Sequence, residues 1–212
     1  MKALRTTGNV FIFLGLSILF FVLYELVGTS LVTKARQHDL QADFQAELES
    51  PSPLNPAFTG KLPIAGNTRS AVRALARIKI PKIGVNAIVV EGVTLERLAY
   101  GPGHYPQTKL FGEKGVTGVA GHRTGWGAPF FNLDRLGRGD VVIVETTAAT
   151  YTYKVTDTIV VSPSHSEVLD GNPKSKAVQQ LVLTTCTPKF TARNRLIVFT
   201  DLVKTVPRAV KK

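Results

Sequence analysis

The sequence predicts a mainly β domain, a barrel or a sandwich of at least seven short strands, joined to an N-terminal transmembrane helix. The strand prediction rests on short β-type runs that follow one another from about residue 74 and are separated by turn residues. The helix prediction rests on an apolar segment near the N-terminus. A composition with 44% hydrophobic and 19% charged residues is typical of a globular chain, and 212 residues allow one domain with accessory segments.

The apolar segment covers residues 10–32, and its only charged residue is Glu25. As a helix it spans about 34 Å at ~1.5 Å per residue, enough for a hydrocarbon core of about 30 Å. A carboxylate at the middle of a bilayer costs about 2.5–3.5 kcal/mol, which favours a place for Glu25 near the outer interface. No good small-x-small cleavage site follows the segment, so we interpret it as an uncleaved signal anchor rather than a signal peptide.

The positive-inside rule hardly favours either orientation of this helix, because Lys2 and Arg5 precede it and Lys34 and Arg36 follow it. A short leading tail and a large following domain favour a cytoplasmic tail at residues 1–9 and an extracellular domain. We therefore expect a single-pass protein of the cell membrane.

A stalk and linker are predicted at residues 33–73. Leu40, Phe44 and Leu48 form a narrow apolar stripe at helical spacing. The stripe fits a dimerising or docking stalk, or a helix that simply continues out of the membrane, and we prefer the second interpretation. The Pro-rich run at 50–56 ends any helix and begins a spacer.

The predicted β domain covers residues 74–204. Its strands lie in two runs within 76–90, on either side of Pro81 and Gly84, and then in 115–121, 141–145, 151–161, 181–185 and 195–203. Residues 94–100 fit a short helix. The basic tail at 205–212 is expected to be frayed.

The chain carries a formal net charge of +11 and one cysteine. The charge fits an anionic neighbour, which could be nucleic acid, a membrane surface or an acidic wall polymer, and does not choose among them. A single cysteine excludes an intramolecular disulfide, so the fold must depend on its core.

That cysteine, Cys186, stands at the end of the predicted strand 181–185, where a rigid backbone can present a nucleophile to a cleft. A buried free cysteine is commonly only a small hydrophobe. The basic residues Lys189, Arg193 and Arg195 favour the nucleophile, because positive charge lowers the pKa of a thiol.

A thiol nucleophile needs a proton partner, and the four histidines are not equivalent candidates. His122 ends the predicted strand 115–121, so it occupies the same kind of place as Cys186, and two strand ends in one sheet can meet. His38 lies in the stalk, and His104 and His165 lie in turn-like segments. Taken alone, His122 is as compatible with a structural role as with a catalytic one.

Acyl transfer also needs positive charge or N–H donors at the developing oxyanion. Arg195 opens the strand 195–203, where strand pairing fixes its position, and is therefore the better candidate. Arg193 lies in the turn and is interpreted as a solvated charge.

These segments together resemble the sortase family of cysteine transpeptidases. LVLTTCTPKFTARNRLIV is similar to the sortase signature, in which a Thr-Leu-x-Thr-Cys strand precedes a strand that opens with an arginine, although Val182 stands where the motif has its first Thr. GPGHYPQT and VAGHRTGWGAPFFNLDRL are similar to the segments that lead to and carry the sortase histidine. The likeness runs from about residue 76 to 203 and is closest to class E sortases of high-GC Gram-positive bacteria, with class D as the nearer rival.

The resemblance implies a closed β-barrel of about eight strands with short helices, and catalytic roles for Cys186, His122 and Arg195. It implies that Tyr105, Thr184 and Thr185 bind substrate, Tyr105 being the candidate for preferring a Leu-Ala-x-Thr-Gly signal over Leu-Pro-x-Thr-Gly. The implied partners are secreted proteins with a C-terminal sorting signal, an amine acceptor on a peptidoglycan precursor or a pilin, and membrane lipid. No nucleic acid and no cofactor are expected. No metal is expected either, because the acidic loop residues Glu113, Glu167 and Asp170 are too sparse.

The implied mechanism has the Cys186 thiolate attack the Thr–Gly carbonyl while His122 protonates the departing amine. At ordinary pKa values a thiolate and an imidazolium coexist in only about 1% of molecules, and we hypothesise that the enzyme works through such a small fraction. Two alternatives remain. An L,D-transpeptidase also uses cysteine and histidine, but its Ser-x-Gly-Cys-x-Arg pattern is absent. A non-catalytic β-domain that binds anionic wall polymer through its charge would leave the cysteine, histidine and arginine placement unexplained.

Overall fold

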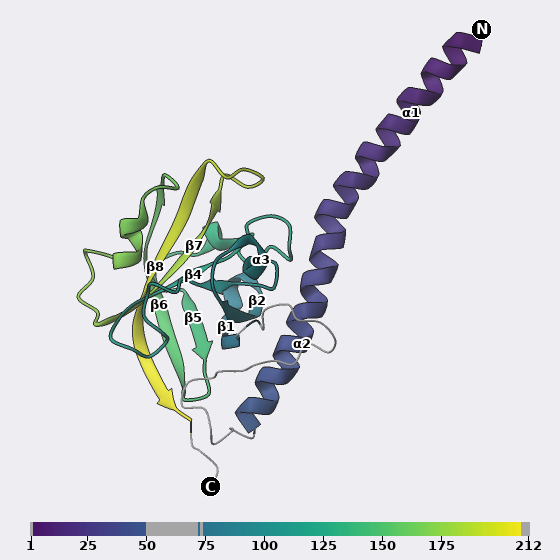
Figure 1. Cartoon of the computed structure of the whole chain (residues 1–212). Coiled ribbons are helices and arrows are strands. Elements are labelled where there is room, and N and C mark those ends of the chain that lie inside the picture. Colours follow the sequence, from purple (N-terminus) through teal and green to yellow (C-terminus); the bar gives the residue numbers. More distant parts are fainter. Residues whose placement is uncertain (1, 50–71, 73, 209–212) are drawn as a thin grey trace.

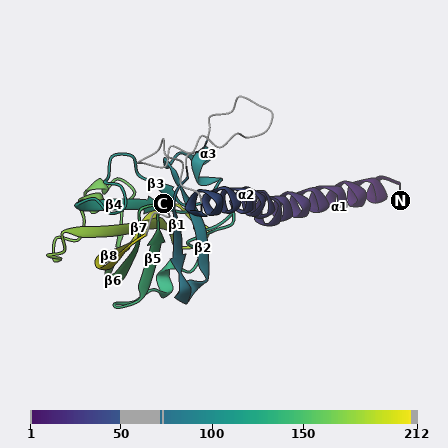
Figure 2. The ribbon, with the colours of Figure 1, turned by 90° about the horizontal axis from the view of Figure 1, so that it is seen from below.

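A closed barrel of eight strands and one long N-terminal helix make up the computed structural model, which describes residues 2–49, 72 and 74–208. The helix consists of α1 (Lys2–Leu23), a single π-helical segment (Tyr24–Gly28) and α2 (Thr29–Glu49). Figure 1 shows α2 lying beside the barrel while α1 extends beyond it, and Figure 2 shows the same arrangement from below. The predicted linker lies outside the described residues, except for residues 33–49 and Val72.

The barrel strands follow the predicted runs, with one addition. They are β1 (Ala74–Ile80), β2 (Val85–Glu91), β3 (Gly103–His104), β4 (Gly115–Ala120), β5 (Val141–Glu145), β6 (Ala149–Val161), β7 (Gln179–Thr187) and β8 (Asn194–Pro207). Around the barrel the order is β1-β2-β3-β4-β7-β8-β6-β5, closed by antiparallel pairing of β5 with β1. The predicted mainly β fold is therefore confirmed as a closed eight-stranded barrel.

Several strand bounds differ from the predicted runs by a few residues, and two of the differences have a clear local reason. β3 has two residues in a segment that reads as turns, and it forms because Gly103 and His104 pair with both β2 and β4. β8 continues to Pro207, past residue 203, where the predicted strand ended, and past residue 204, where the predicted domain ended, because the start of β6 pairs with it from Ala149 onward.

Short helical turns connect the strands: α3 (Leu95–Leu98) and the 3₁₀ turns η2 (Pro81–Ile83), η3 (Leu133–Arg135) and η4 (Ser166–Asp170). α3 confirms the short helix expected at 94–100, and the Thr94 hydroxyl caps it by accepting from the Arg97 amide.

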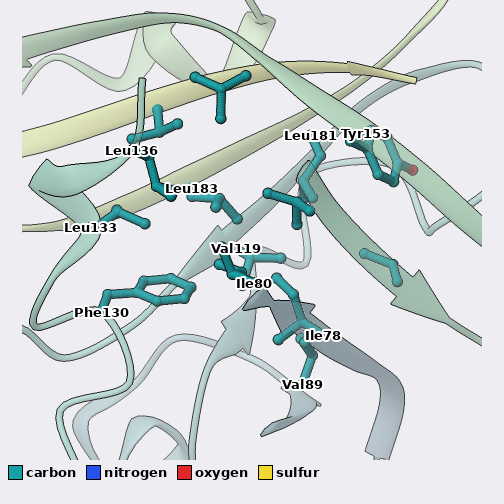
Figure 3. Packing of buried hydrophobic residues seen from close by; sticks show 14 of the residues in the cluster. Ile78, Ile80, Val89, Val119, Phe130, Leu133, Leu136, Tyr153, Leu181 and Leu183 are labelled. Carbon is teal, nitrogen blue, oxygen red and sulfur yellow. The ribbon is translucent and has the colours of Figure 1, made fainter. Parts of the chain in front are cut away.

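The core fills the inside of the barrel with aliphatic side chains from nearly every strand, closed at one end by Phe130, Leu133 and Leu136 of the segment after β4. Figure 3 shows these side chains converging with Val119, Leu181 and Leu183. Side chains alternate between the two faces of a strand, so residues between these inward positions point out of the barrel.

The α2 helix packs on the outside of β1 and β2 through the apolar stripe, with Leu40 and Phe44 buried against Ala74, Ile88 and Val90. The helix continues directly from α1, as we expected, and it also docks, on the chain's own barrel. Two residues of β3 cannot cover the whole edge of β2. The side-chain amide of Gln37 therefore fills the gap like a strand, accepting from the Ile88 amide (2.7 Å) and donating to the Ile88 carbonyl (3.0 Å).

Candidate active site

The predicted catalytic residues stand in one row across three adjacent strands. Strand β4 pairs in parallel with β7, with Ala120 opposite Thr184, and two more steps of this register bring His122 opposite Cys186. Two hydrogen bonds fix the extension: the Gly121 amide donates to the Thr184 carbonyl (3.0 Å), and the Thr185 hydroxyl donates to the Gly121 carbonyl (2.7 Å).

The third member of the row comes from β8, which pairs antiparallel with β7 and places Arg195 directly opposite Cys186. Neighbouring strands are separated by about 4.8 Å, and residues opposite each other project from the same face. Leu181 and Leu183 of β7 point into the core, so Cys186, three residues after Leu183, points outward. His122, Cys186 and Arg195 therefore form a row on the outer surface of the barrel, here called the catalytic row.

Burial distinguishes His122 from the other histidines. Its side chain is half-buried, and its Nε2 atom is buried without a hydrogen-bond partner among the described residues. Burial lowers the pKa of His122 from its ordinary value of 6.5, because desolvation disfavours the imidazolium. The ring is therefore mainly neutral at pH 7.

His104 has the opposite character. It is 1% exposed, and both ring nitrogens have partners: Nδ1 lies 3.2 Å from Glu91 Oε1, and Nε2 lies 3.1 Å from the Lys109 carbonyl oxygen. His165 is exposed and pairs with Glu167, and His38 is exposed on α2 beside Asp39. Neither lies in the catalytic row.

The guanidinium of Arg195 turns back to its own loop, where Nη1 donates to the carbonyl oxygens of Ala192 (3.1 Å) and Asn194 (3.2 Å). An arginine has five N–H donors, so these two bonds leave Nε and Nη2 for a substrate. Arg193 is exposed in the turn, as expected for a solvated charge.

The predicted substrate-binding residues divide into two groups. Tyr105 and Thr184 lie on the outer face, and their hydroxyl groups are hydrogen-bonded at 2.9 Å. Thr184 precedes Cys186 by two residues on β7, so the pair lies one row from the nucleophile position. Thr185 is buried and points to the inside of the barrel, where it positions the Gly121 backbone, so the structure does not bring it to the surface of the row.

A depression of about 450 Å³ lies on the outer face between the segment after β3 and η4, and its lining includes Thr108, Val116 and Leu169. Beside it, Gly118 of β4 leaves room for the side chains that pack over the strand: a Cβ there would lie 2.9 Å from Tyr105 Cδ2 and from Leu169 Cδ2. The segment after β3 and η4 therefore meet over β4.

Arg123 is a site residue that our sequence reasoning overlooked. It is 3% exposed and holds three segments together: Nε donates to the Phe131 carbonyl (3.0 Å), Nη1 to the Cys186 carbonyl (3.2 Å), and Nη2 pairs with Asp134 Oδ1 (3.1 Å). It thus fixes the backbone at Cys186 and the loop after His122. Its position directly after His122 is the one feature of the sequence that could have indicated a role for Arg123 at the site.

The long N-terminal helix also reaches the site. A depression of about 440 Å³ on the other side of His122 is lined by Trp126, by Leu95 and Tyr100, and by Arg36 of α2. Arg36 stacks over the Tyr100 ring at 4.3 Å. No signal in the sequence placed a stalk residue beside His122.

A family model described as "Sortase domain" matches residues 78–203, more than half of the chain. The chain belongs to the sortase family. Sortase SrtE1 of Streptomyces coelicolor is 32% identical over 99% of this chain, and the chain spans 60% of that relative's length. Sortase SrtE2 of the same organism is also 32% identical, over 96% of this chain and 83% of the relative.

Solved sortases share the fold. The crystal structure of sortase E1 from Streptomyces coelicolor with a tripeptide in its active site has a TM-score of 0.60 at 34% identity, covering 64% of this chain and 91% of that chain. A Clostridium perfringens sortase D5 transpeptidase has a TM-score of 0.64 at 27% identity, covering 80% of this chain and 99% of that chain. The likeness to class E that the motifs predicted is thus found in the relatives as well.

Proposed function

We propose that this sortase is a membrane-anchored cysteine transpeptidase that cleaves a C-terminal sorting signal between Thr and Gly and transfers the acyl group to an amine. The observation that carries the proposal is the catalytic row, because strand register brings a thiol, an imidazole and a guanidinium side by side on one outer face. A wall-binding module has no need of this arrangement.

In the proposed mechanism the Cys186 thiolate attacks the Thr–Gly carbonyl carbon and the C–N bond breaks. His122 gives its proton to the departing glycine amine, and an N–H group of Arg195 stabilises the oxyanion. The acceptor amine then attacks the thioester and loses a proton to His122, and the C–S bond breaks to regenerate the Cys186 thiolate. The Nε2 atom of His122 is buried and has no hydrogen-bond partner among the residues that the structure describes, which supports this double role because no fixed contact holds its proton.

The proposed first substrate is a secreted protein whose signal reads Leu-Ala-x-Thr-Gly or Leu-Pro-x-Thr-Gly. The depression between the segment after β3 and η4 supports a place for an extended peptide on the outer face, and the Tyr105–Thr184 hydroxyl pair lies one row before the nucleophile. The proposed acceptor is an amine on a peptidoglycan precursor or a pilin.

The proposed anchor is α1, with residues 1–9 in the cytoplasm and the barrel outside. Within the described chain, one helical window, Thr6–Leu23, is long and apolar enough to cross a membrane. The predicted segment extended to Val32, but Thr29 is buried against the barrel and accepts a hydrogen bond from the Trp126 amide (3.2 Å). We therefore place the outer boundary of the membrane near Glu25.

The experiment uses the full chain in lipid nanodiscs, with each of the two signal peptides and an amine acceptor. Because Cys186 is the only cysteine, a thioester mass on the protein can be assigned without ambiguity. We expect cleavage between Thr and Gly, a transpeptidation product, and complete loss of both in Cys186→Ala. Full activity of Cys186→Ala, or the absence of any thioester with both peptides, would contradict the proposal and favour the wall-binding module.

A further inference from the structure

Apolar side chains, two of them highly exposed and two half-buried, lie beside the catalytic row. Outside the membrane helix and α2, Leu95 (80% exposed) and Phe190 (70%) have the highest exposure among the large hydrophobic side chains that the structure describes. Leu95 and Trp126 line the same depression as His122, and Phe190 lies edge-on to Phe131, with ring centroids 6.3 Å apart. We call Leu95, Trp126, Phe131 and Phe190 the apolar rim.

The backbone of the rim is held in an unfavourable conformation. Trp126 and Phe190 both have positive φ angles, 47° and 65°, which are uncommon for residues with large side chains. Strained backbone of this kind clusters at functional sites and persists only where the surrounding structure holds it in place. Two separate loops therefore each present an aromatic residue in this conformation beside the catalytic row.

The anchor helix fixes the distance of the rim from the hydrocarbon core of the membrane. The Trp126 amide donates to Thr29, and the Gly127 amide donates to the Ser30 hydroxyl (3.4 Å). Thr29 lies six residues after Leu23, the end of the apolar window, which is about 9 Å along a helix. The headgroup layer of a bilayer is about 5–8 Å thick on each side, so these contacts place the rim at its outer edge.

The rest of the contact with α2 keeps the barrel at this distance. Leu40 and Phe44 are buried against the barrel, and the Gln37 side chain donates to the carbonyl oxygens of Ile88 and Tyr100. Figure 1 shows the turn between β7 and β8, which carries Phe190, at the end of the barrel towards α1.

The composition of the rim fits a lipid surface. Tryptophan and other aromatic residues are favoured at the membrane–water interface, and basic residues beside them attract anionic headgroups. Lys189 lies over the Phe131 ring at 4.1 Å, and Arg193 is exposed in the same turn. The formal net charge of the chain, +11, is opposite in sign to that of anionic headgroups.

We propose that the apolar rim rests in the headgroup layer of the membrane that α1 crosses, so that the catalytic row opens at the lipid surface. The inference rests on the proposed membrane anchoring. It adds that the barrel contacts lipid itself, through loops from β4, α3 and the β7–β8 turn.

Trp126 is the only tryptophan of the chain and reports directly on the rim. The full chain is reconstituted in vesicles of phosphatidylcholine and phosphatidylglycerol that contain lipids brominated near the headgroup or near the chain end. We expect shallow bromines to quench Trp126 emission at least two-fold more than deep ones, and aqueous iodide to quench it weakly. Equal quenching by both lipids, or none with free access for iodide, would overturn the proposal.

Two variants test whether quenching of Trp126 by shallow bromines depends on the distance of the barrel from the membrane and on the apolar side chains of the rim. Inserting eleven polar helix-forming residues between Leu23 and Tyr24 adds about three turns, raises the barrel by about 16 Å and keeps its facing. The insertion should abolish lipid quenching and restore access for iodide. Phe190→Ser should reduce shallow quenching about two-fold, whereas Val178→Ser, an equally exposed position (66%) just before β7 at the opposite end of the strand, should not. Unchanged quenching in the insertion variant would overturn the proposal.

These outcomes are separate from those of the peptide assay. Shallow quenching in a protein that forms no thioester would support the rim and reject transpeptidation. A thioester in a protein whose Trp126 is unquenched would support transpeptidation and reject the contact of the rim with lipid. Release of the chain from vesicles by alkaline carbonate would overturn both the anchoring and the rim.

Discussion

His104 and His122 lie at the ends of neighbouring strands, β3 and β4, yet their surroundings have opposite character. His104 is buried with both nitrogens bonded, one of them beside Glu91. His122 is half-buried and lies opposite Cys186, and its Nε2 has no partner within the described part of the chain. In the first region the polar groups of the ring hold chain segments together, whereas in the second a ring nitrogen is not committed to a contact within the described chain. The difference fits a structural role for His104 and the proposed proton-transfer role for His122.

The sharpest test of this comparison is the matched pair His122→Leu and His104→Leu. His122→Leu should lower kcat/KM by about 10²–10⁴, because the leaving amine loses its proton donor, and should leave the melting temperature almost unchanged. His104→Leu should lower the free energy of unfolding by about 1–3 kcal/mol, because the Lys109 carbonyl loses its partner, with little effect on kcat/KM of the folded enzyme. Peptide kinetics and calorimetry measure both. The opposite pattern would reject the distinction.

Arg123 contacts both the fold and the backbone of Cys186, so it tests whether stability and activity can be assigned to separate residues. Arg123→Gln removes the contacts with the Cys186 carbonyl and Asp134, and we expect a loss of about 2–3 kcal/mol of stability together with at least a ten-fold fall in kcat. Arg138→Gln, in an exposed turn, is the control. A stability loss without any change in kcat would show that Arg123 serves the fold alone.

The Tyr105–Thr184 hydroxyl pair connects the two regions, since Tyr105 follows His104 and Thr184 precedes Cys186 by two residues. Tyr105→Phe and Thr184→Val should each raise the KM for the sorting peptide about two- to ten-fold, with kcat nearly constant. If the pair acts as one unit, the double variant should resemble either single variant. Fully additive effects would contradict this.

The smallest expected effect is a pH dependence. Because the pKa of His122 lies below 6.5 in the folded protein, the acid limb of the kcat/KM profile should lie below pH 6.5. The unfolded chain binds a proton at His122 more readily, so the free energy of unfolding should fall as the pH drops from 6.5 through the folded pKa. His122→Gln should remove this part of the slope. An acid limb above 6.5 would contradict the burial argument.

Strand pattern and motif spacing predicted most of the barrel and the identity of the row, because alternation and turn residues act over short distances. β5 has the bounds that its sequence run predicts. Contacts that depend on a single side chain could not be predicted. The Gln37 amide replaces a missing strand, and the Arg123 guanidinium reaches a carbonyl 63 residues away, and neither leaves a periodic signal. Thr185 was assigned to substrate, but alternation along β7 turns it into the core.

The parallel pairing of β4 with β7 also limits how the gene can change. Adding or deleting one codon within either strand would turn every later side chain of that strand to the opposite face, so His122 or Cys186 would point into the core. The same constraint applies to β5 and β6, which lie in the connection between β4 and β7, because both strands pair within the barrel. The segments without strand pairing, such as 162–165 and 171–178, have no register to keep. Insertions and deletions should therefore accumulate in those segments and be absent from 115–122, 141–145, 149–161 and 179–187.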